Sequence, residues 1–126
     1  MTVYLDLEDA LEQVAFLGFM VKDVGLLDSA LARPRTSLFG EDAYPDLPTK
    51  AAAMMHSLIK NHPLIDGNKR TGWLLFVSFI AINGYQHTMT SDEAFDLTIG
   101  LATDAFTIEA AAKIISDHLV IRASLS

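Results

Sequence analysis

The chain of 126 residues has 16 acidic and 9 basic side chains, 51% hydrophobic residues and no cysteine. This length is typical of one compact domain, so we expect a single domain over residues 1–126 that needs neither a disulfide nor a structural metal. The absence of cysteine excludes thiolate metal sites and a thiol nucleophile. The net charge of −7 disfavours direct nucleic-acid binding, which requires a basic face.

The composition favours helices throughout. Alanine, leucine and isoleucine are abundant, glycine and proline are few, and no run alternates apolar and polar residues, so we predict an all-α domain. Residues 1–13 have no basic segment of the kind that begins a signal peptide. The apolar run Trp73–Ile82 is far shorter than the ~20 residues of a membrane span. We therefore expect a buried core helix in a cytoplasmic protein without membrane contact.

The first half of the chain predicts two helices and a long connection. Asp6 can cap a first helix, whose apolar residues recur at helical spacing as far as Val21. A short second helix is expected over 26–32, where Pro34 stops it. The segment 33–48 has three prolines and several acidic residues without an apolar period, which indicates a loop or short hairpin.

The second half predicts four helices. Thr49 can cap a helix that runs to residue 61, and the longest apolar helix is expected over 68–82, where an Asn-Gly pair ends it. Two further helices are predicted over 91–103 and 107–121. The aromatic residues of the 68–82 helix are expected in the core.

The segment 62–70 carries the residues best suited to binding or catalysis, and it reads His-Pro-Leu-Ile-Asp-Gly-Asn-Lys-Arg. Gly67 and Asn68 tolerate positive φ, so the backbone can curl and direct N–H groups inward. The helix start adds unpaired N–H groups and the positive end of its dipole, which suits phosphate. Lys69 and Arg70 lie at this same end, where each cation costs about 0.3–1 kcal/mol. A bound polyanion would offset that cost.

Two further side chains complete this pattern. An imidazole such as that of His62 can take a proton from an attacking hydroxyl. Asp66 can hold Mg²⁺ beside bound phosphates. Together these residues suit Mg²⁺-assisted phosphoryl or nucleotidyl transfer. Each also has a structural interpretation, with His62 as a helix C-cap, Asp66 as an N-cap and the Gly-Asn pair as an ordinary turn.

The segment His-Pro-Leu-Ile-Asp-Gly-Asn-Lys-Arg-Thr resembles the signature of the Fic/Doc family. The pattern is His-x-Phe-x-Asp/Glu-Gly-Asn-x-Arg-x-x-Arg in Fic enzymes and His-x-Phe-x-Asp-Ala-Asn-Lys-Arg-Thr in Doc-type members. Residues 25–34 also resemble the Doc-type segment before the flap, so the likeness covers about residues 20–85. It implies an all-α fold in which the signature loop 62–70 joins two central helices. It also implies a flap over 35–48 that lays the target segment along the site by strand addition.

The resemblance implies a role for each signature residue. His62 would be the general base and Asp66 the Mg²⁺ ligand. The nucleotide phosphates would be bound by Gly67, Asn68, Lys69 and Arg70. This chain departs from the family at Leu64, where phenylalanine is usual. It also has Lys69 and Trp73 where AMP-transferring Fic enzymes have glycine and a second arginine, which is Doc-like, whereas Gly67 is Fic-like.

By this resemblance we expect the toxin of a toxin–antitoxin pair that acts as an ATP-dependent protein kinase. Its target would be a Ser/Thr hydroxyl of a translation factor, namely elongation factor Tu, and an antitoxin protein would dock on an apolar groove between helices. One alternative is protein AMP transfer, which Gly67 keeps open. Another is a catalytically inactive module that binds a nucleotide or a partner. A metal-dependent hydrolase is disfavoured because the histidines are scattered.

Overall fold

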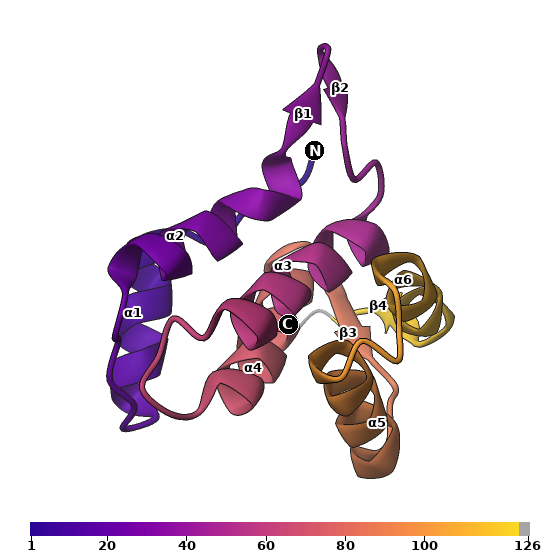
Figure 1. The fold of residues 1–126 in the computed structure, drawn as a ribbon. Coiled ribbons are helices and arrows are strands. Elements are labelled where there is room, and N and C mark those ends of the chain that lie inside the picture. The colour runs from indigo at the N-terminus through magenta and orange to yellow at the C-terminus, as the bar shows by residue number, and fades with distance from the viewer. Residues whose placement is uncertain (124–126) are drawn as a thin grey trace.

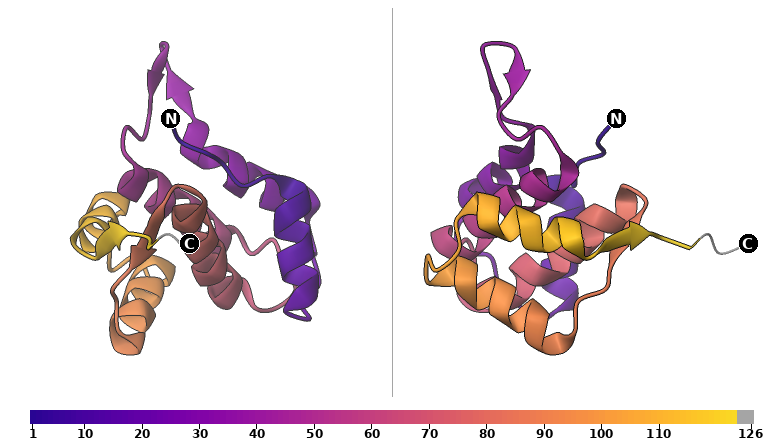
Figure 2. Two further views of the ribbon diagram at one scale, coloured as in Figure 1. Left: turned by 180° about the vertical axis from the view of Figure 1, so that it is seen from behind. Right: turned by 90° about the vertical axis from the view of Figure 1, so that its right-hand side faces the viewer.

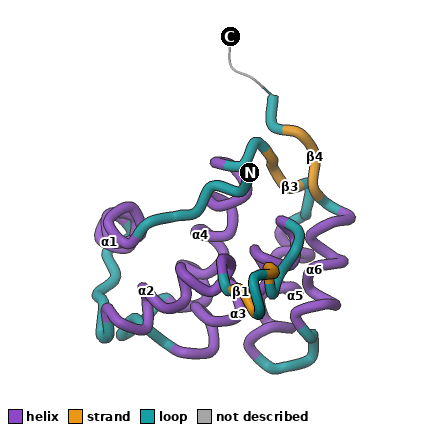
Figure 3. The backbone as a smooth tube through the Cα atoms, turned by 90° about the horizontal axis from the view of Figure 1, so that it is seen from above, coloured by secondary structure: helices purple, strands orange, loops and turns teal. Residues whose placement is uncertain are grey.

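The computed structural model describes residues 1–123, which form six α-helices and two short antiparallel sheets. In chain order the elements are α1 (Leu7–Phe16), α2 (Val24–Ala32), η1 (Arg33–Arg35, a 3₁₀ turn), β1 (Ser37–Leu38), β2 (Glu41–Asp42), α3 (Leu47–Asn61), α4 (Asn68–Ile82), β3 (Tyr85–His87), α5 (Ser91–Ala102), α6 (Ile108–Asp117) and β4 (Leu119–Ile121). The helices lie as three neighbouring pairs, with α3 and α4 between the other two (Figures 1 and 3). The all-α prediction with a short hairpin is confirmed.

Helix α3 occupies the centre, and six consecutive residues, Lys50 to Met55, are buried, so the helix is covered on every side there. Its alanines at 51–53 and the methionines that follow are fully buried. Helix α4 packs beside it through Phe76 and Phe79, both with no exposed surface, so these aromatic residues belong to the core as predicted. Trp73 is only partly buried and packs against Phe76 with ring centroids 5.2 Å apart. Among residues 1–123, no helix has both the length and the apolar character needed to cross a membrane.

The first helix is shorter than predicted, since it ends at Phe16 and does not continue to Val21. Gly18 adopts φ 81°, a left-handed conformation that stops the helix. The N–H groups of Gly18 and Phe19 then bond to carbonyls of the last turn, which is the Schellman arrangement. Val21 instead forms an antiparallel bridge with Leu64. The apolar spacing beyond residue 17 therefore reflects an extended segment.

Two helices begin earlier than predicted because an aspartate upstream caps each of them. The carboxylate of Asp23 accepts from the Leu26 N–H at 3.1 Å. The carboxylate of Asp46, and not Thr49, caps α3 and accepts from the Thr49 N–H at 2.9 Å. Pro48 is accommodated in the first turn, where its missing N–H leaves no bond unmade.

The last helix is also shorter than predicted, because residues 119–121 form strand β4 and not a helical turn. This strand pairs antiparallel with β3, with Tyr85 opposite Ile121 and Gln86 opposite Val120. The β-branched residues at 120 and 121 favour the extended conformation. In the right-hand view of Figure 2, β4 continues from the end of α6, and it pairs with β3.

The predicted loop or hairpin over 33–48 is a hairpin, with Ser37 opposite Asp42. Its base is fixed by Lys50, whose side chain is only 2% exposed and whose ammonium donates to the Pro34 carbonyl at 3.1 Å and to Asp42 at 3.3 Å. The hairpin projects from the N-terminal end of α3, whereas the loop 62–67 follows the C-terminal end (Figure 1). A helix of this length spans about 22 Å. The role of a flap that lays a target along the loop therefore stays a prediction.

Two histidines away from this loop differ in their surroundings. Both ring nitrogens of His118 face acceptors, namely the Ile114 carbonyl at 2.7 Å and the Glu93 carboxylate at 2.9 Å, which raises the pKa of His118. Burial, followed by the nearby Arg33, lowers the pKa of His56, whose Nδ1 lies 2.9 Å from the Arg33 guanidinium. The surroundings of His118 favour the charged ring, and those of His56 favour the neutral ring.

We expect the stabilisation by His118 to depend on pH. Because its folded-state pKa is raised, its contribution is fully present below the ordinary value of 6.5 and is lost as pH rises through the folded-state pKa. The difference in free energy of unfolding between the wild type and His118→Gln should therefore shrink with rising pH. Urea unfolding from about pH 5.5 to 8.5 measures this difference.

His56→Gln provides the opposite control. Its folded-state pKa is lowered, so its contribution is present above 6.5 and declines as pH falls. The same pH trend for both variants would contradict the assigned protonation states.

Candidate nucleotide site at the start of α4

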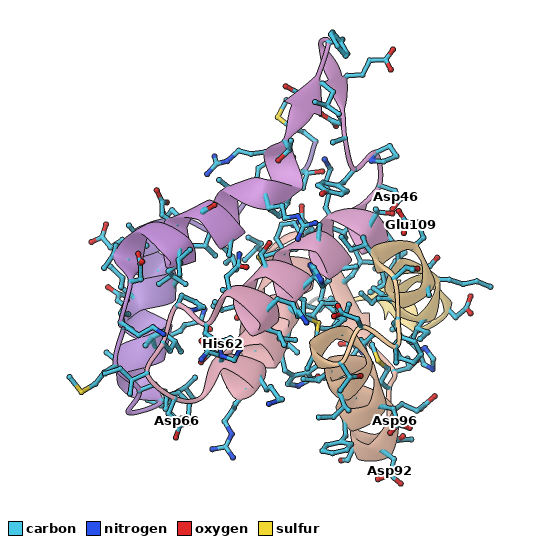
Figure 4. The ribbon with its side chains drawn as sticks, viewed as in Figure 1. Asp46, His62, Asp66, Asp92, Asp96 and Glu109 are labelled. Carbon is cyan, nitrogen blue, oxygen red and sulfur yellow. The ribbon has the colours of Figure 1, made fainter. Side chains whose placement is uncertain are left out.

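The loop between α3 and α4 borders an open cavity of about 430 Å³. Every residue that the sequence assigned to the site lines this cavity, together with Phe19 and Ile65. The assigned residues are His62, Asp66, Gly67, Asn68, Lys69 and Arg70. In Figure 4, His62 lies inside the bend formed by residues 62–67, and Asp66 lies on its outer edge. The structure thus brings the predicted residues together around one space.

The backbone makes the bend with two left-handed residues. His62 ends α3 with φ 50°, and Gly67 precedes α4 with φ 80°. The proline at 63 disfavours the right-handed helical region for His62, so the helix stops there. Gly67 occupies the N-cap position of α4 without a side-chain cap, so the alternative interpretation of Asp66 as an N-cap is wrong. The carboxylate of Asp66 instead accepts from the Gly67 N–H at 2.8 Å.

Asn68 closes the bend from inside. Its side chain is nearly buried, its oxygen accepts from the Leu64 N–H at 2.9 Å, and its amide nitrogen donates to the Leu64 carbonyl at 3.1 Å. The same nitrogen lies 3.3 Å from His62 Nδ1. Because these contacts occupy the side chain, any contact of Asn68 with phosphate falls to its backbone N–H. Leu64, 1% exposed, fills the core position expected of the family's phenylalanine.

The connection between α1 and α2 closes the bend from outside. The N–H groups of Lys22 and Asp23 donate to the Pro63 carbonyl at 2.8 and 3.0 Å. The Ile65 N–H donates to the Met20 carbonyl at 3.0 Å. These contacts join segments forty or more residues apart. They are made by backbone atoms, and no residue pattern in the sequence signals them.

Phe19 covers the glycine of the bend. The ring lies so close to Gly67 that a Cβ at residue 67 would overlap it. The left-handed φ of Gly67 disfavours a side chain independently. Glycine at this position, the Fic-like feature of the sequence, is thus explained by packing as well as by backbone conformation.

The cations of the site are Lys69 and Arg70, both exposed in the first turn of α4. Lys60, in the last turn of α3, does not line the cavity. Its ammonium donates to Asp104 at 2.8 Å and to the Ala102 carbonyl at 3.3 Å. Two cations and the positive end of the α4 dipole therefore face the cavity, an arrangement that attracts an anion.

The residues present fit Mg²⁺ only with help from a substrate. Within residues 1–123, no three histidine or acidic side chains gather as a metal-binding group. Mg²⁺ commonly takes one or two carboxylates and completes its shell with water and substrate phosphates. The exposed carboxylate of Asp66, at the edge of an anion-binding bend, suits that arrangement.

A second, apolar groove of about 330 Å³ begins at the same cations and runs between α4 and α5. Its walls include Trp73, Phe95 and Ile99, and Phe95 is 64% exposed. No motif in the sequence indicates this groove, although helical spacing places residues 69 and 73, like 95 and 99, on one side of a helix.

The fold and this loop define a class of protein, namely all-α domains with a His-x-x-x-Asp-Gly-Asn-Lys-Arg loop before a central helix. Residues 4–80 match the Fic/DOC family. The chain is also 50% identical over 108 residues to Toxin Doc of Mycolicibacterium smegmatis (strain ATCC 700084 / mc(2)155), a match that covers 82% of this chain and 83% of that protein. The chain therefore belongs to the Fic/Doc family.

The role of Asn68 as a clamp predicts a loss of stability in Asn68→Ala. The change leaves the buried N–H and carbonyl of Leu64 without partners, which should lower the free energy of unfolding by about 1–3 kcal/mol. Urea unfolding measures this loss, and amide exchange at Leu64 should become faster. Asn61→Ala, a change at the exposed end of α3, is the matched control. Equal stability of the two variants would contradict the clamp.

Proposed function

We propose that this chain is the toxin of a toxin–antitoxin pair and acts as an ATP-dependent protein kinase. The observation that carries the proposal is the single cavity shared by His62, the bend at Gly67 and the cations Lys69 and Arg70. The name of the Mycolicibacterium relative, Toxin Doc, supports the part of the proposal that makes this chain a toxin. The target follows from the family resemblance and is a Ser/Thr hydroxyl of a translation factor, elongation factor Tu.

In this proposal the triphosphate of ATP binds where α4 begins. Backbone N–H groups at the helix start hold phosphate oxygens, Arg70 grips them through two nitrogens, and Lys69 adds a point charge. Mg²⁺ held by Asp66 would neutralise charge on the phosphates. The target hydroxyl oxygen bonds to the γ-phosphorus while the bond to the β–γ bridging oxygen breaks. His62 takes the hydroxyl proton, and ADP leaves.

The contact of His62 with Asn68 bears on its role as a base. An amide NH₂ group only donates, so the 3.3 Å contact is a hydrogen bond only when His62 Nδ1 carries no proton. In the neutral ring Nε2 then holds the proton. Proton acceptance at Nε2 therefore requires the other tautomer, in which this long contact opens. The contact is weak at this length, so the change of tautomer costs little.

Two observations favour phosphoryl transfer over AMP transfer. Trp73 stands where the AMP-transferring pattern has a second arginine, and it packs edge-on against His87 with ring centroids 4.9 Å apart. A phosphate clamp is therefore replaced by an apolar contact. Gly67, the feature that keeps AMP transfer open, is accounted for by its contact with Phe19 and does not require Fic chemistry.

The antitoxin would dock on an apolar groove of about 530 Å³ between α1 and α4. Leu17, Leu74 and Val77 line it. Helix α1 lies on the opposite side of α4 from α5 (Figure 3). The apolar lining of the groove suits the hydrophobic face of a partner helix. This assignment rests on the family resemblance and on the position of the groove.

His62→Ala should abolish phosphoryl transfer and growth inhibition, with a loss in rate of about 10²- to 10⁴-fold. The fold should survive because the His62 side chain is exposed. Growth of cells that express each variant, together with transfer of labelled phosphate to the purified factor, provides the readout. His87→Gln removes a histidine outside the cavity and should remain active. An alanine variant as toxic as the wild type would instead identify a binding module without catalysis.

The reaction itself is decided by the position of the label. With ATP labelled at the γ-phosphate the target should become labelled, and with ATP labelled at the α-phosphate it should not, because ADP leaves. Autoradiography of the isolated target after incubation with each nucleotide measures this. Labelling from the α-phosphate would establish AMP transfer and overturn the kinase proposal.

A further inference from the structure

We infer that Phe19 is a positioning residue for the site, acting through Gly67 to hold the backbone of the bend in its phosphate-binding curvature. The inference rests on the proposed function. It assigns a role to a residue outside the signature, forty-eight positions upstream of the glycine that it contacts.

The position of Phe19 is itself fixed by the end of α1. Its N–H bonds to the Val14 carbonyl at 3.1 Å, closing the Schellman turn around Gly18. The next residue, Met20, accepts from the Ile65 N–H at 3.0 Å. One short segment thus holds the loop through a backbone bond and through an aromatic ring.

The ring of Phe19 restrains Gly67, the most flexible residue of the bend. Gly67 has the widest conformational freedom in the loop because it lacks a side chain. The side chain of Asn68 restrains the loop at Leu64, three residues before Gly67. The ring of Phe19 lies directly against Gly67 and also lines the cavity. Removing the ring should therefore free Gly67 and misdirect the N–H groups that follow it.

Phe19 is partly exposed, so its role is separable from folding. A core phenylalanine would mainly affect the free energy of unfolding, whereas a residue at the cavity edge mainly affects the geometry of the loop. Misplacement of reacting groups by about 1 Å can reduce a rate roughly 10²-fold. We therefore expect a catalytic loss out of proportion to the change in melting temperature.

The test compares Phe19→Ala, Phe19→Leu and Phe19→Tyr in the full chain. Phe19→Ala should lower kcat/KM for phosphoryl transfer by about ten- to a hundredfold, with a melting temperature lower by only a few degrees and faster amide exchange at residues 67 and 68. Phe19→Leu should lie between this variant and the wild type, and Phe19→Tyr, which keeps the ring, should restore most activity. Ile82→Ala, at the other end of α4 and also partly exposed, is the control expected to remain active.

A pair of variants at residue 67 tests the contact itself. Gly67→Ala places a methyl group against the ring, so it should lower Mg²⁺–ATP affinity and loosen the loop. Phe19→Ala combined with Gly67→Ala removes that overlap and should bind Mg²⁺–ATP more tightly than Gly67→Ala alone. Additive losses would overturn the inferred contact.

The outcomes separate the inference from the proposed function. If the wild type transfers no phosphate to any protein, the proposed function fails whatever residue 19 does. If the wild type is active and Phe19→Ala has the same kcat, KM and amide exchange, the inference fails and the proposed function stands. A fall in activity that only matches global unfolding, without recovery in Phe19→Tyr, also overturns it.

Discussion

Hydrogen bonds from two directions hold the bend between α3 and α4, and the chemistry of the site depends on them. Asn68 bonds to Leu64 from within, while the connection between α1 and α2 bonds to Pro63 and Ile65 from outside. A loop fixed in this way directs its N–H groups before any ligand arrives. Little ordering then remains to oppose the binding of an anion.

The core supplies the rigid support for that bend. Helices α3 and α4 meet through fully buried side chains, so the two ends of the loop cannot move independently. Lys69 and Arg70 stand at the positive end of the α4 dipole, where they add a field that a local anion would relieve. The acidic chain can thus present a small basic site without a basic surface. The buried residues of α4 contribute to the core, whereas its exposed first turn carries the two cations.

Local patterns predicted much of this molecule, and contacts between distant segments account for most of the rest. The helix over 68–82 and the loop that precedes it could be predicted because each depends on residues that are neighbours in the chain. The apolar spacing continues past Gly18, so this spacing does not indicate that α1 ends before it. The pairing of β3 with β4 and the contact of Phe19 with Gly67 join segments far apart in the chain, and single residue patterns do not specify them.

We propose that the bend is already shaped for triphosphate in the ligand-free protein, and a crystal structure with Mg²⁺ and a non-hydrolysable ATP analogue would test this. We expect phosphates against the backbone of residues 67–70, His62 facing the terminal phosphate, and loop atoms shifted by less than about 1 Å from the ligand-free protein. A nucleotide bound elsewhere, or a loop that must refold to receive it, would refute the proposal.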